Sequence, residues 1–234
     1  MAALPQAPAH PFRPALFRFL KELAENNDRD WFQDNKGRYE EVARGPAMEF
    51  IAAVAPGLAR VSKHIRADPR PVGGSLFRIH RDVRFSKDKS PYKTHVGIHF
   101  RHEAAKDVHA PGYYLHLEPG GIFFGCGIWH PDAKTAHRIR QAIVDDPAAW
   151  RRAIRAKRFA ARLTLGGEAL KRPPRDFPPD HPLVEDLKRK DFIADAFLKQ
   201  RDVTRPDFHG DFVELCKDGQ PLMRFLCKAL ELPF

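Results

Sequence analysis

The sequence has few cysteines and no long apolar run. Cys126, Cys216 and Cys227 are too few and too far apart for a disulfide framework or a Cys-x-x-Cys metal knuckle. No apolar run reaches the length of about 18 residues that marks a membrane-spanning helix. Residues 1–14 also lack the apolar core of a signal peptide. These absences predict a cytoplasmic protein with reduced thiols and no membrane partner.

Common catalytic signatures are absent as well. The sequence contains no Gly-x-Ser-x-Gly nucleophile motif, no Walker loop, no Gly-x-Gly-x-x-Gly behind a strand and no His-Glu-x-x-His motif. Whether the protein is an enzyme therefore stays open at this level. The sequence names no cofactor, and we assign no residue as a metal ligand from it.

Positive charge is present in excess and is unevenly placed. The formal net charge is +10, with an excess of six positive charges in residues 61–110 and of seven in residues 148–190. This placement favours a positive surface and an anionic partner, either a phosphorylated small molecule or nucleic acid. An acidic protein is a further alternative. Solubility alone would account for the charge equally well.

The first third of the chain has helical periodicity. Pro14 suits the first turn of one helix, Asp28 can cap a second, and Gly45-Pro46 can open a third. We expect residues 1–15 to form a tail and residues 16–234 to form a single domain.

Apolar and polar side chains alternate in the middle of the chain, which is typical of strands with one buried face. The alternating stretches are 76–85, 94–101 and 113–118, and an apolar stretch with glycines follows at 122–129. Short connections favour an antiparallel sheet. The predicted buried row consists of Phe77, Ile79, Val83, Phe85, Val96, Ile98, Phe100, Leu115 and Leu117.

The last part of the chain returns to helical patterns. One helix is expected after Pro131, and Asp146-Pro147 opens another. The prolines of residues 170–182 predict a long surface loop. The C-terminal region predicts one or two helices with a break at residues 217–219. The order of helices, sheet and helices predicts an α+β fold, a central antiparallel sheet with N-terminal and C-terminal helices packed on it.

Charged side chains occupy the polar row of the first predicted strand. Residues two apart on a strand lie about 6.6 Å apart, so Arg78 and Arg84 would belong to a ladder suited to phosphate or carboxylate groups. A turn-rich loop of lysines follows, which would add mobile point charges. The predicted anion-binding residues are Arg78, Arg84, Ser86, Lys87, Lys89, Tyr92 and Lys93. The alternative is a solvated hairpin whose cations pair with Asp82 and Asp88.

Arg81 falls in the apolar row of the same predicted strand. A buried guanidinium needs a carboxylate partner, because an unpaired buried charge is costly. We expect that partner on an adjacent strand or at Asp207 or Asp211. The alternative is a bulge that shifts the register and exposes Arg81.

Histidines are the candidate catalytic residues. His95, His99 and His116 all fall on the predicted polar face, and Glu118 follows two residues after His116. Imidazole and carboxylate groups can bind a metal ion or exchange protons. The alternative function is therefore a histidine-dependent, possibly metal-assisted enzyme on the same face. Solvated or hydrogen-bonded histidines are the competing interpretation.

The stretch RDVRFSKDKSPYKTH (81–95) resembles the signature of an uncharacterised family of conserved hypothetical proteins from bacteria and fungi. The stretches LFRFLKELAENNDRDWFQDNKGRYE (16–40) and GYYLHLEPGGIFFGCGIW (112–129) and the proline-rich loop support this resemblance, which covers residues 16 to 200. The resemblance implies that the charged stretch belongs to a family pattern. It implies no activity, because the family has no assigned function.

Overall fold

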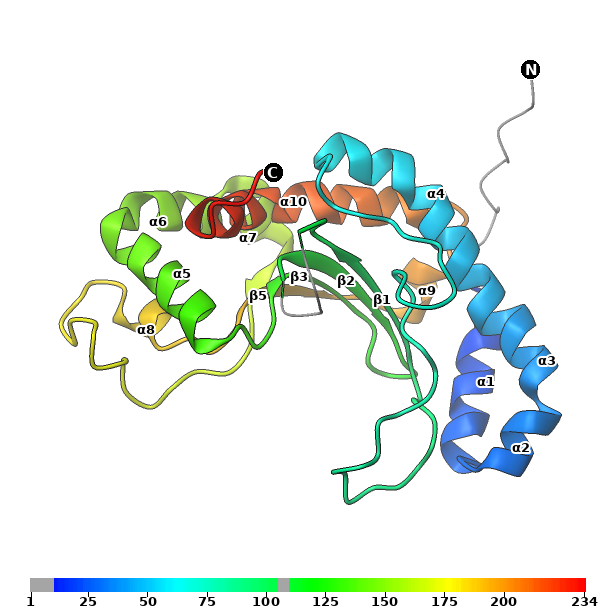
Figure 1. Cartoon of the computed structure of the whole chain (residues 1–234). Coiled ribbons are helices and arrows are strands. Elements are labelled where there is room, and N and C mark those ends of the chain that lie inside the picture. Colours follow the sequence, from blue (N-terminus) through cyan, green and yellow to red (C-terminus); the bar gives the residue numbers. More distant parts are fainter. Residues whose placement is uncertain (1–10, 105–109) are drawn as a thin grey trace.

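An antiparallel sheet lies at the centre of the chain, in the strand order β1-β2-β3-β5-β4 (Figure 1). The structure is a computed structural model that describes residues 11–104 and 110–234. The described strands are β1 (Val96–Arg101), β2 (Gly112–Leu117), β3 (Phe123–Ile128), β4 (Thr164–Leu165) and β5 (Phe192–Phe197). Each neighbouring pair is antiparallel. The predicted α+β class with a central antiparallel sheet is confirmed.

Helices precede the sheet, and they begin where the sequence predicts. Pro14 lies in the first turn of the first helix, and the Asp28 carboxylate accepts a 2.9 Å hydrogen bond from the Trp31 N–H at the start of the second. Phe12 is fully buried, although it falls within the predicted tail, of which residues 1–10 lie outside the described residues. The elements are α1 (Pro14–Glu25), α2 (Arg29–Asp34), α3 (Lys36–Tyr39), the π-helical segment η1 (Glu40–Arg44) and α4 (Gly45–Val61).

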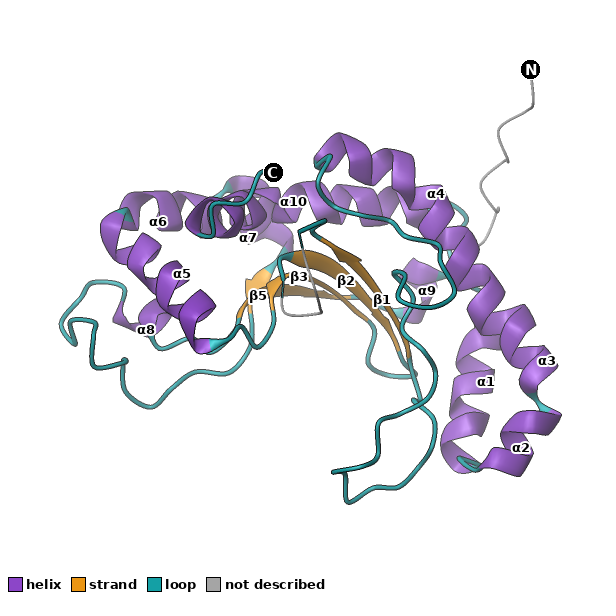
Figure 2. Cartoon of the chain, in the orientation of Figure 1, coloured by secondary structure: helices purple, strands orange, loops and turns teal. Residues whose placement is uncertain are grey.

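Helices also follow the sheet, and two long helices pack against it. Figure 2 shows α4 and α10 lying over the same face. Residues 170–182 form no helix or strand, as their prolines predict. The elements are α5 (Ala133–Asp145), α6 (Pro147–Arg155), α7 (Lys157–Arg162), α8 (Val184–Leu187), α9 (Gln200–Val203) and α10 (Phe208–Ala229).

The predicted break at residues 217–219 is wrong, because α10 runs through it without interruption. Asp218 is buried, and its carboxylate pairs with Arg158 at 2.7 Å and with Arg162 at 2.8 Å. Gly219 faces the sheet, where an added Cβ atom would lie 2.8 Å from Cys126 Sγ. The polar residue and the glycine therefore serve an ion pair and a close helix–sheet contact instead of a turn.

The predicted strand 76–85 is also wrong. Its residues form only isolated bridges, Leu76 with Ile98 and His80 with Tyr92. The Arg81 N–H donates to Pro91 O at 2.9 Å, and the Lys93 N–H donates to Ile79 O at 2.8 Å, so the chain folds back on itself. We call residues 78–93 the basic hairpin. It extends from the body of the molecule beside the sheet (Figure 1).

The predicted buried row is confirmed within the sheet and at Ile79, and it fails at Phe77 and in the outer part of the basic hairpin. Phe77 and Val83 are half-buried, and Phe85 is 96% exposed. Apolar and polar residues still alternate after Ile79. The hairpin has left the core there, however, so the alternation no longer predicts which side chains are buried. The buried members are Ile79, Val96, Ile98, Phe100, Leu115 and Leu117.

The strand β5, which pairs with both β3 and β4, is not among the strands predicted from the sequence. Its buried residues are Phe192, Ala194 and Ala196, and alternation carried by alanines is a weak signal for a strand. The three cysteines are free and buried, as expected. In the described chain, no helix combines the length and apolar character needed to cross a membrane.

Candidate functional site

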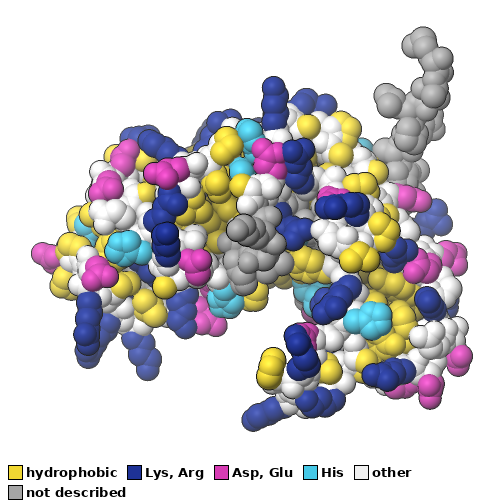
Figure 3. All heavy atoms as spheres, viewed as in Figure 1, with side chains coloured by type: hydrophobic (Ala, Val, Ile, Leu, Met, Phe, Trp, Pro, Cys, Tyr) yellow, Lys and Arg dark blue, Asp and Glu magenta, His cyan; other side chains and the backbone are white. Residues whose placement is uncertain are grey.

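The two faces of the sheet differ. The face under α4 and α10 carries Leu115 and Phe124, which are fully buried. We call the opposite face the open face. In Figure 3 the outline of the molecule is indented beneath the sheet, between the lobe of α5 to α8 and the basic hairpin. Alternate residues of four strands contribute the side chains of the open face, which include His99, Tyr114, His116, Phe123, Asp195 and Phe197.

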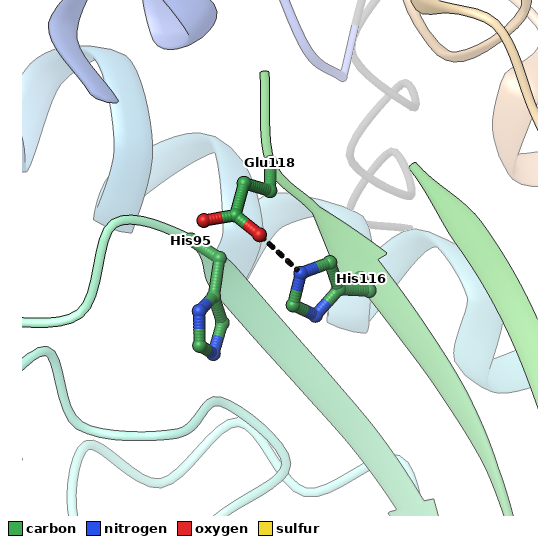
Figure 4. A group of neighbouring side chains, drawn as sticks. All are labelled: His95, His116 and Glu118. Carbon is green, nitrogen blue, oxygen red and sulfur yellow. Dashed lines mark hydrogen bonds and ion pairs between the residues drawn. The ribbon is translucent and has the colours of Figure 1, made fainter. Parts of the chain in front are cut away.

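Three side chains converge at one end of the open face, and we call them the histidine cluster (Figure 4). His95 lies just before β1, His116 lies on β2, and Glu118 lies just after β2. One nitrogen or oxygen atom of each lies within 4.8 Å of the other two. The two imidazole ring centres are 4.4 Å apart, and His116 Nε2 is 3.2 Å from Glu118 Oε2.

Neighbouring groups orient the histidine cluster. The Tyr114 hydroxyl lies 3.0 Å from His116 Nδ1, and the Thr94 hydroxyl donates to Glu118 Oε1 at 2.6 Å. The Phe123 ring stacks on the His116 ring at 4.8 Å between centres. His116 and Glu118 are therefore each held through an atom other than the one that could bind a metal ion, which is the usual support around metal ligands in proteins.

The electrostatics favour neutral imidazoles beside an ionised carboxylate. Burial, together with the nearby His116, lowers the pKa of His95 to about 4. Burial also lowers the pKa of His116, against the opposing effect of Glu118. Burial alone would raise the pKa of Glu118, but hydrogen bonds from Thr94 and His116 outweigh it and leave the pKa low. These are the protonation states in which histidine and glutamate bind metal ions.

The donor set of two imidazoles and one carboxylate has a defined chemistry. It occurs in catalytic zinc sites and in non-haem iron(II) sites, both of which keep coordination positions open for water or substrate. His95, His116 and Glu118 could therefore hold a divalent transition-metal ion. The sequence makes His95 and His116 catalytic candidates and places Glu118 on the same face, and the structure brings the three together.

His99, the third histidine candidate, does not join the cluster. It lies within β1, two residues after Gly97 and opposite Tyr114 on β2. Only 8% of its surface is exposed. Its Nδ1 atom has no hydrogen-bond partner among the described residues. Burial lowers its pKa to about 4, and Arg101 adds to that effect.

The predicted ladder of the basic hairpin is not formed, because most of its cations are already engaged. Arg84 pairs with Asp82 at 2.6 Å, and Lys89 Nζ donates to Val83 O at 2.9 Å. Ser86 is half-buried. The alternative of a hairpin with internal ion pairs therefore describes this segment better than a ladder of free donors.

Tyr92 and Arg81 also differ from expectation. Tyr92 is buried and stacks on Phe32 with 4.0 Å between ring centres, so its ring lies in the core and not beside a surface anion. Arg81 is half-buried and pairs with Asp88 within the hairpin. The carboxylates proposed as its partners, Asp207 and Asp211, pair with Arg205 instead.

Three cations of the hairpin remain relevant to a ligand. Lys93 is half-buried, its Nζ donates to Arg78 O at 2.6 Å, and burial lowers its pKa. The side chains of Arg78 and Lys87 form no ion pair with any described residue. Lys93 and Arg81 both disfavour protonation of His95, which places positive charge beside the histidine cluster. Lys and Arg side chains gather on this hairpin in Figure 3.

Sequence reasoning missed two carboxylates of β5 and its start. Asp195 lies on the open face opposite Gly125, and burial raises its pKa to about 6. Asp191 is buried at the other end of the sheet and accepts a 2.8 Å hydrogen bond from the His130 N–H. The alternation of residues 192–197 could have indicated this strand, but its pairing with β3 could not be read from one sequence.

Two surface hollows lie elsewhere. One, of about 550 Å³, is lined by residues that include Arg66, Asp68 and Glu103. The other, of about 370 Å³, is lined by residues of α5, α6 and α10 that include Phe225. Neither includes a residue of the histidine cluster.

The fold and the cluster thus define an α+β protein with a candidate metal centre on its sheet. A family model described as a conserved hypothetical protein, DUF2461, matches residues 15–225, so the chain belongs to this family. The resemblance drawn from the charged stretch is confirmed at the level of the family. No curated protein and no solved structure matches the chain.

Proposed function

We propose that the protein is a metal-dependent enzyme that acts on a small anionic substrate at the histidine cluster. The observation that carries this proposal is the convergence of His95, His116 and Glu118 within 4.8 Å. Histidines that are merely solvated do not need this arrangement. The hydroxyls of Tyr114 and Thr94 hold two of the three side chains in place, which supports a site organised for an ion.

The surroundings favour an anionic substrate. Lys93 and Arg81 of the basic hairpin both act on the pKa of His95. Lys93 Nζ, which has three donors, makes one hydrogen bond among the described residues, to Arg78 O. A bound divalent ion would add its own positive charge. A phosphate or carboxylate group between the ion and the hairpin would therefore meet positive charge on both sides.

Hydrolysis of a phosphate ester is the reaction that suits this site best. A divalent ion held by three protein ligands acts as a Lewis acid and lowers the pKa of bound water to about 7. Such an ion would supply an activated water: in the balanced reaction the water oxygen would replace the alcohol on phosphorus, the ester P–O bond would break, and a water proton would pass to the leaving alcohol. The cations of the hairpin would hold the phosphate group through this exchange.

Metal content tests the proposal. The protein is purified without an affinity tag in chelator-free buffer, and bound zinc, iron, manganese and cobalt are measured by mass spectrometry. We expect about one ion per chain, and loss of that ion in His116→Ala and Glu118→Gln. The matched control is His137→Ala, which removes a half-exposed histidine elsewhere on the surface. If the wild type takes up no divalent ion, or if His116→Ala binds it as tightly, the proposal is wrong.

A second candidate is metal-independent binding of a phosphate-bearing ligand by the basic hairpin. The side chains of Arg78 and Lys87, which form no ion pair within the described residues, favour it. Changing Lys87, Lys89 and Lys93 together to alanine should then weaken phosphate binding in the absence of metal. For a duplex nucleic acid, affinity should also fall with salt, with a logarithmic slope of about −0.9 per neutralised phosphate. Binding that needs the metal and tolerates the triple change would favour the metal centre alone.

A further inference from the structure

The histidine cluster is one end of a longer polar and aromatic surface. His116, Phe123 and Phe197 lie opposite one another on β2, β3 and β5. Phe123 stacks on His116, and its ring centre lies 6.2 Å from that of Phe197. Phe197 is 84% exposed. An aromatic strip therefore begins at the candidate metal ligand and continues across the open face into solvent.

A gap in side chains lies beside this strip. Gly125 sits between Tyr114 and Asp195 in the next row of the sheet. An added Cβ atom there would lie 3.1 Å from Asp195 Oδ1 and 3.9 Å from atoms of both Phe123 and Tyr114. Gly125 therefore presents only backbone to the open face between these three residues.

Asp195 gives the far end of this surface a negative group. Its carboxylate is half-buried and has no hydrogen bond or ion pair with any residue in the described ranges. Its pKa is raised by burial and by Asp191. A half-buried carboxylate without donors is poorly solvated, so a ligand that supplies N–H groups would bind there favourably.

The surface therefore has two chemically different ends. Positive charge from Lys93 and Arg81 lies at the histidine cluster on one side. The acceptor Asp195 lies two strands from His116 and two residues further along the sheet, a distance of about 12 Å at the usual strand spacing and rise. Between them are the rings of Phe123 and Phe197. A matching ligand has an anionic group, a flat ring and N–H donors on the ring edge.

We propose that the open face binds a nucleoside monophosphate, with the phosphate at the histidine cluster, the base on Phe123 and Phe197, and the base edge at Asp195. This inference rests on the proposed function and names its substrate class. Base stacking on an aromatic side chain is a common mode of nucleotide recognition. An ionised carboxylate accepts two parallel N–H donors, and guanine presents such a pair on one edge, so GMP is the best-matched probe.

Binding is measured by calorimetry with the metal-loaded protein at pH 7.5. The probes are GMP, AMP, ribose 5-phosphate and a short single-stranded RNA. We expect GMP to bind at least about tenfold more tightly than ribose 5-phosphate, which has the anion without the base. Phe197→Ala should remove that difference and leave ribose 5-phosphate unaffected. Asp195→Asn should remove the preference for GMP over AMP.

The control is Phe85→Ala, which removes a more exposed phenylalanine at the basic hairpin and not on the open face. It should keep the full difference between GMP and ribose 5-phosphate. Equal binding of these two probes by the wild type, or an unchanged difference in Phe197→Ala, overturns the nucleotide inference. Tighter binding of the RNA than of GMP overturns it in favour of a nucleic-acid strand.

Metal content is measured on the same samples to separate the two proposals. If the ion is present and ribose 5-phosphate binds as well as GMP, the substrate class is wrong while the metal centre stands. If no ion binds, the proposed function is wrong. GMP binding to the metal-free protein then tests separately whether the base contacts Phe123, Phe197 and Asp195.

Discussion

Val96 lies opposite Leu117 across β1 and β2, and this register places His95 beside Glu118. His95 precedes Val96 in the chain and Glu118 follows Leu117, so both lie just beyond this terminal pair of the ladder. Both side chains project on the open face. His116 precedes Glu118 by two residues, so it shares that face. One backbone register therefore assembles the whole histidine cluster, and the same register buries Val96 and Leu117 under the helices.

The Tyr114 hydroxyl should tune the metal affinity of the cluster. Tyr114→Phe removes the group that lies 3.0 Å from His116 Nδ1 and should lower the metal affinity about tenfold without changing the stoichiometry, because His116 loses its orienting partner. Competition with a chromogenic chelator measures the affinity. Tyr113→Phe is the matched control, since its hydroxyl lies on the other face and has no hydrogen-bond partner in the described structure. An equal loss in both variants would contradict this role.

The sequence predicts the parts of this site that depend on local patterns. The alternation of β2 places His116 and Glu118 on one face, and the alternation of β1 places His95 on the face opposite Val96. Their convergence depends on the register between two strands, and no local pattern encodes it. The same limit applies to Asp195, because β5 reaches the sheet through a long-range pairing with β3.

The errors of the sequence analysis have physical causes. Residues 76–85 alternate like a strand, but the hairpin satisfies its backbone groups with its own returning arm, as between Arg81 and Pro91. Charged residues suggested a free ladder, although carboxylates close by in sequence, such as Asp82 and Asp88, could pair with them. Asp218 and Gly219 resemble a turn only when the buried ion pair and the close approach of Cys126 are unknown.

Arg81 should contribute little to stability. Arg81 pairs with Asp88 on a solvent-exposed hairpin, where ion pairs are screened by water and salt. Arg81→Met should therefore melt close to the wild-type temperature, measured by circular dichroism. A large drop in the melting temperature would indicate a buried pair in solution. Arg205→Met, at another surface ion pair, provides the comparison.

Two glycines of α10 should respond in opposite directions to the same substitution. Gly210→Ala should stabilise the protein by about 1 kcal/mol, because alanine favours helix and nothing lies within 4 Å of the added Cβ atom. Gly219→Ala should destabilise it by about 1–3 kcal/mol, because the Cβ atom would approach Cys126 Sγ to 2.8 Å. Urea denaturation measures both. If Gly219→Ala is also stabilising, α10 does not pack on β3 as described.

Asp191 should be a major determinant of stability. It is 1% exposed, and its carboxylate accepts hydrogen bonds from the His130 N–H at 2.8 Å and the Glu168 N–H at 2.9 Å. Asp191→Ala should cost about 3 kcal/mol, because two part-buried backbone donors lose their common acceptor. Urea denaturation again measures the loss. Asp180→Ala, at an exposed position, should change the stability by less than about 0.5 kcal/mol.

Asp195 should make the stability of the metal-free protein fall with rising pH. Burial raises its pKa in the folded state to about 6, from an ordinary value of 3.8. Between these pH values the carboxylate of the folded protein binds a proton more tightly than that of the unfolded chain. Raising the pH removes this proton and therefore lowers the free energy of unfolding. The stabilising effect of the proton is present below pH 4 and is lost by about pH 6 to 7.

Asp195→Asn removes this titration and keeps the shape of the side chain. We expect the variant to match the wild type near pH 4 and to be more stable by about 1 kcal/mol at pH 7.5, a figure reduced for the partial solvent exposure of the group. Urea denaturation in metal-free buffers from pH 4 to 8 measures the difference. Asp180→Asn should show no such trend. If the difference in stability between Asp195→Asn and the wild type does not grow between pH 4 and 6.5, the ionised carboxylate is not destabilised on the open face. Hydrogen-bond donors of a ligand would then not be expected to stabilise it.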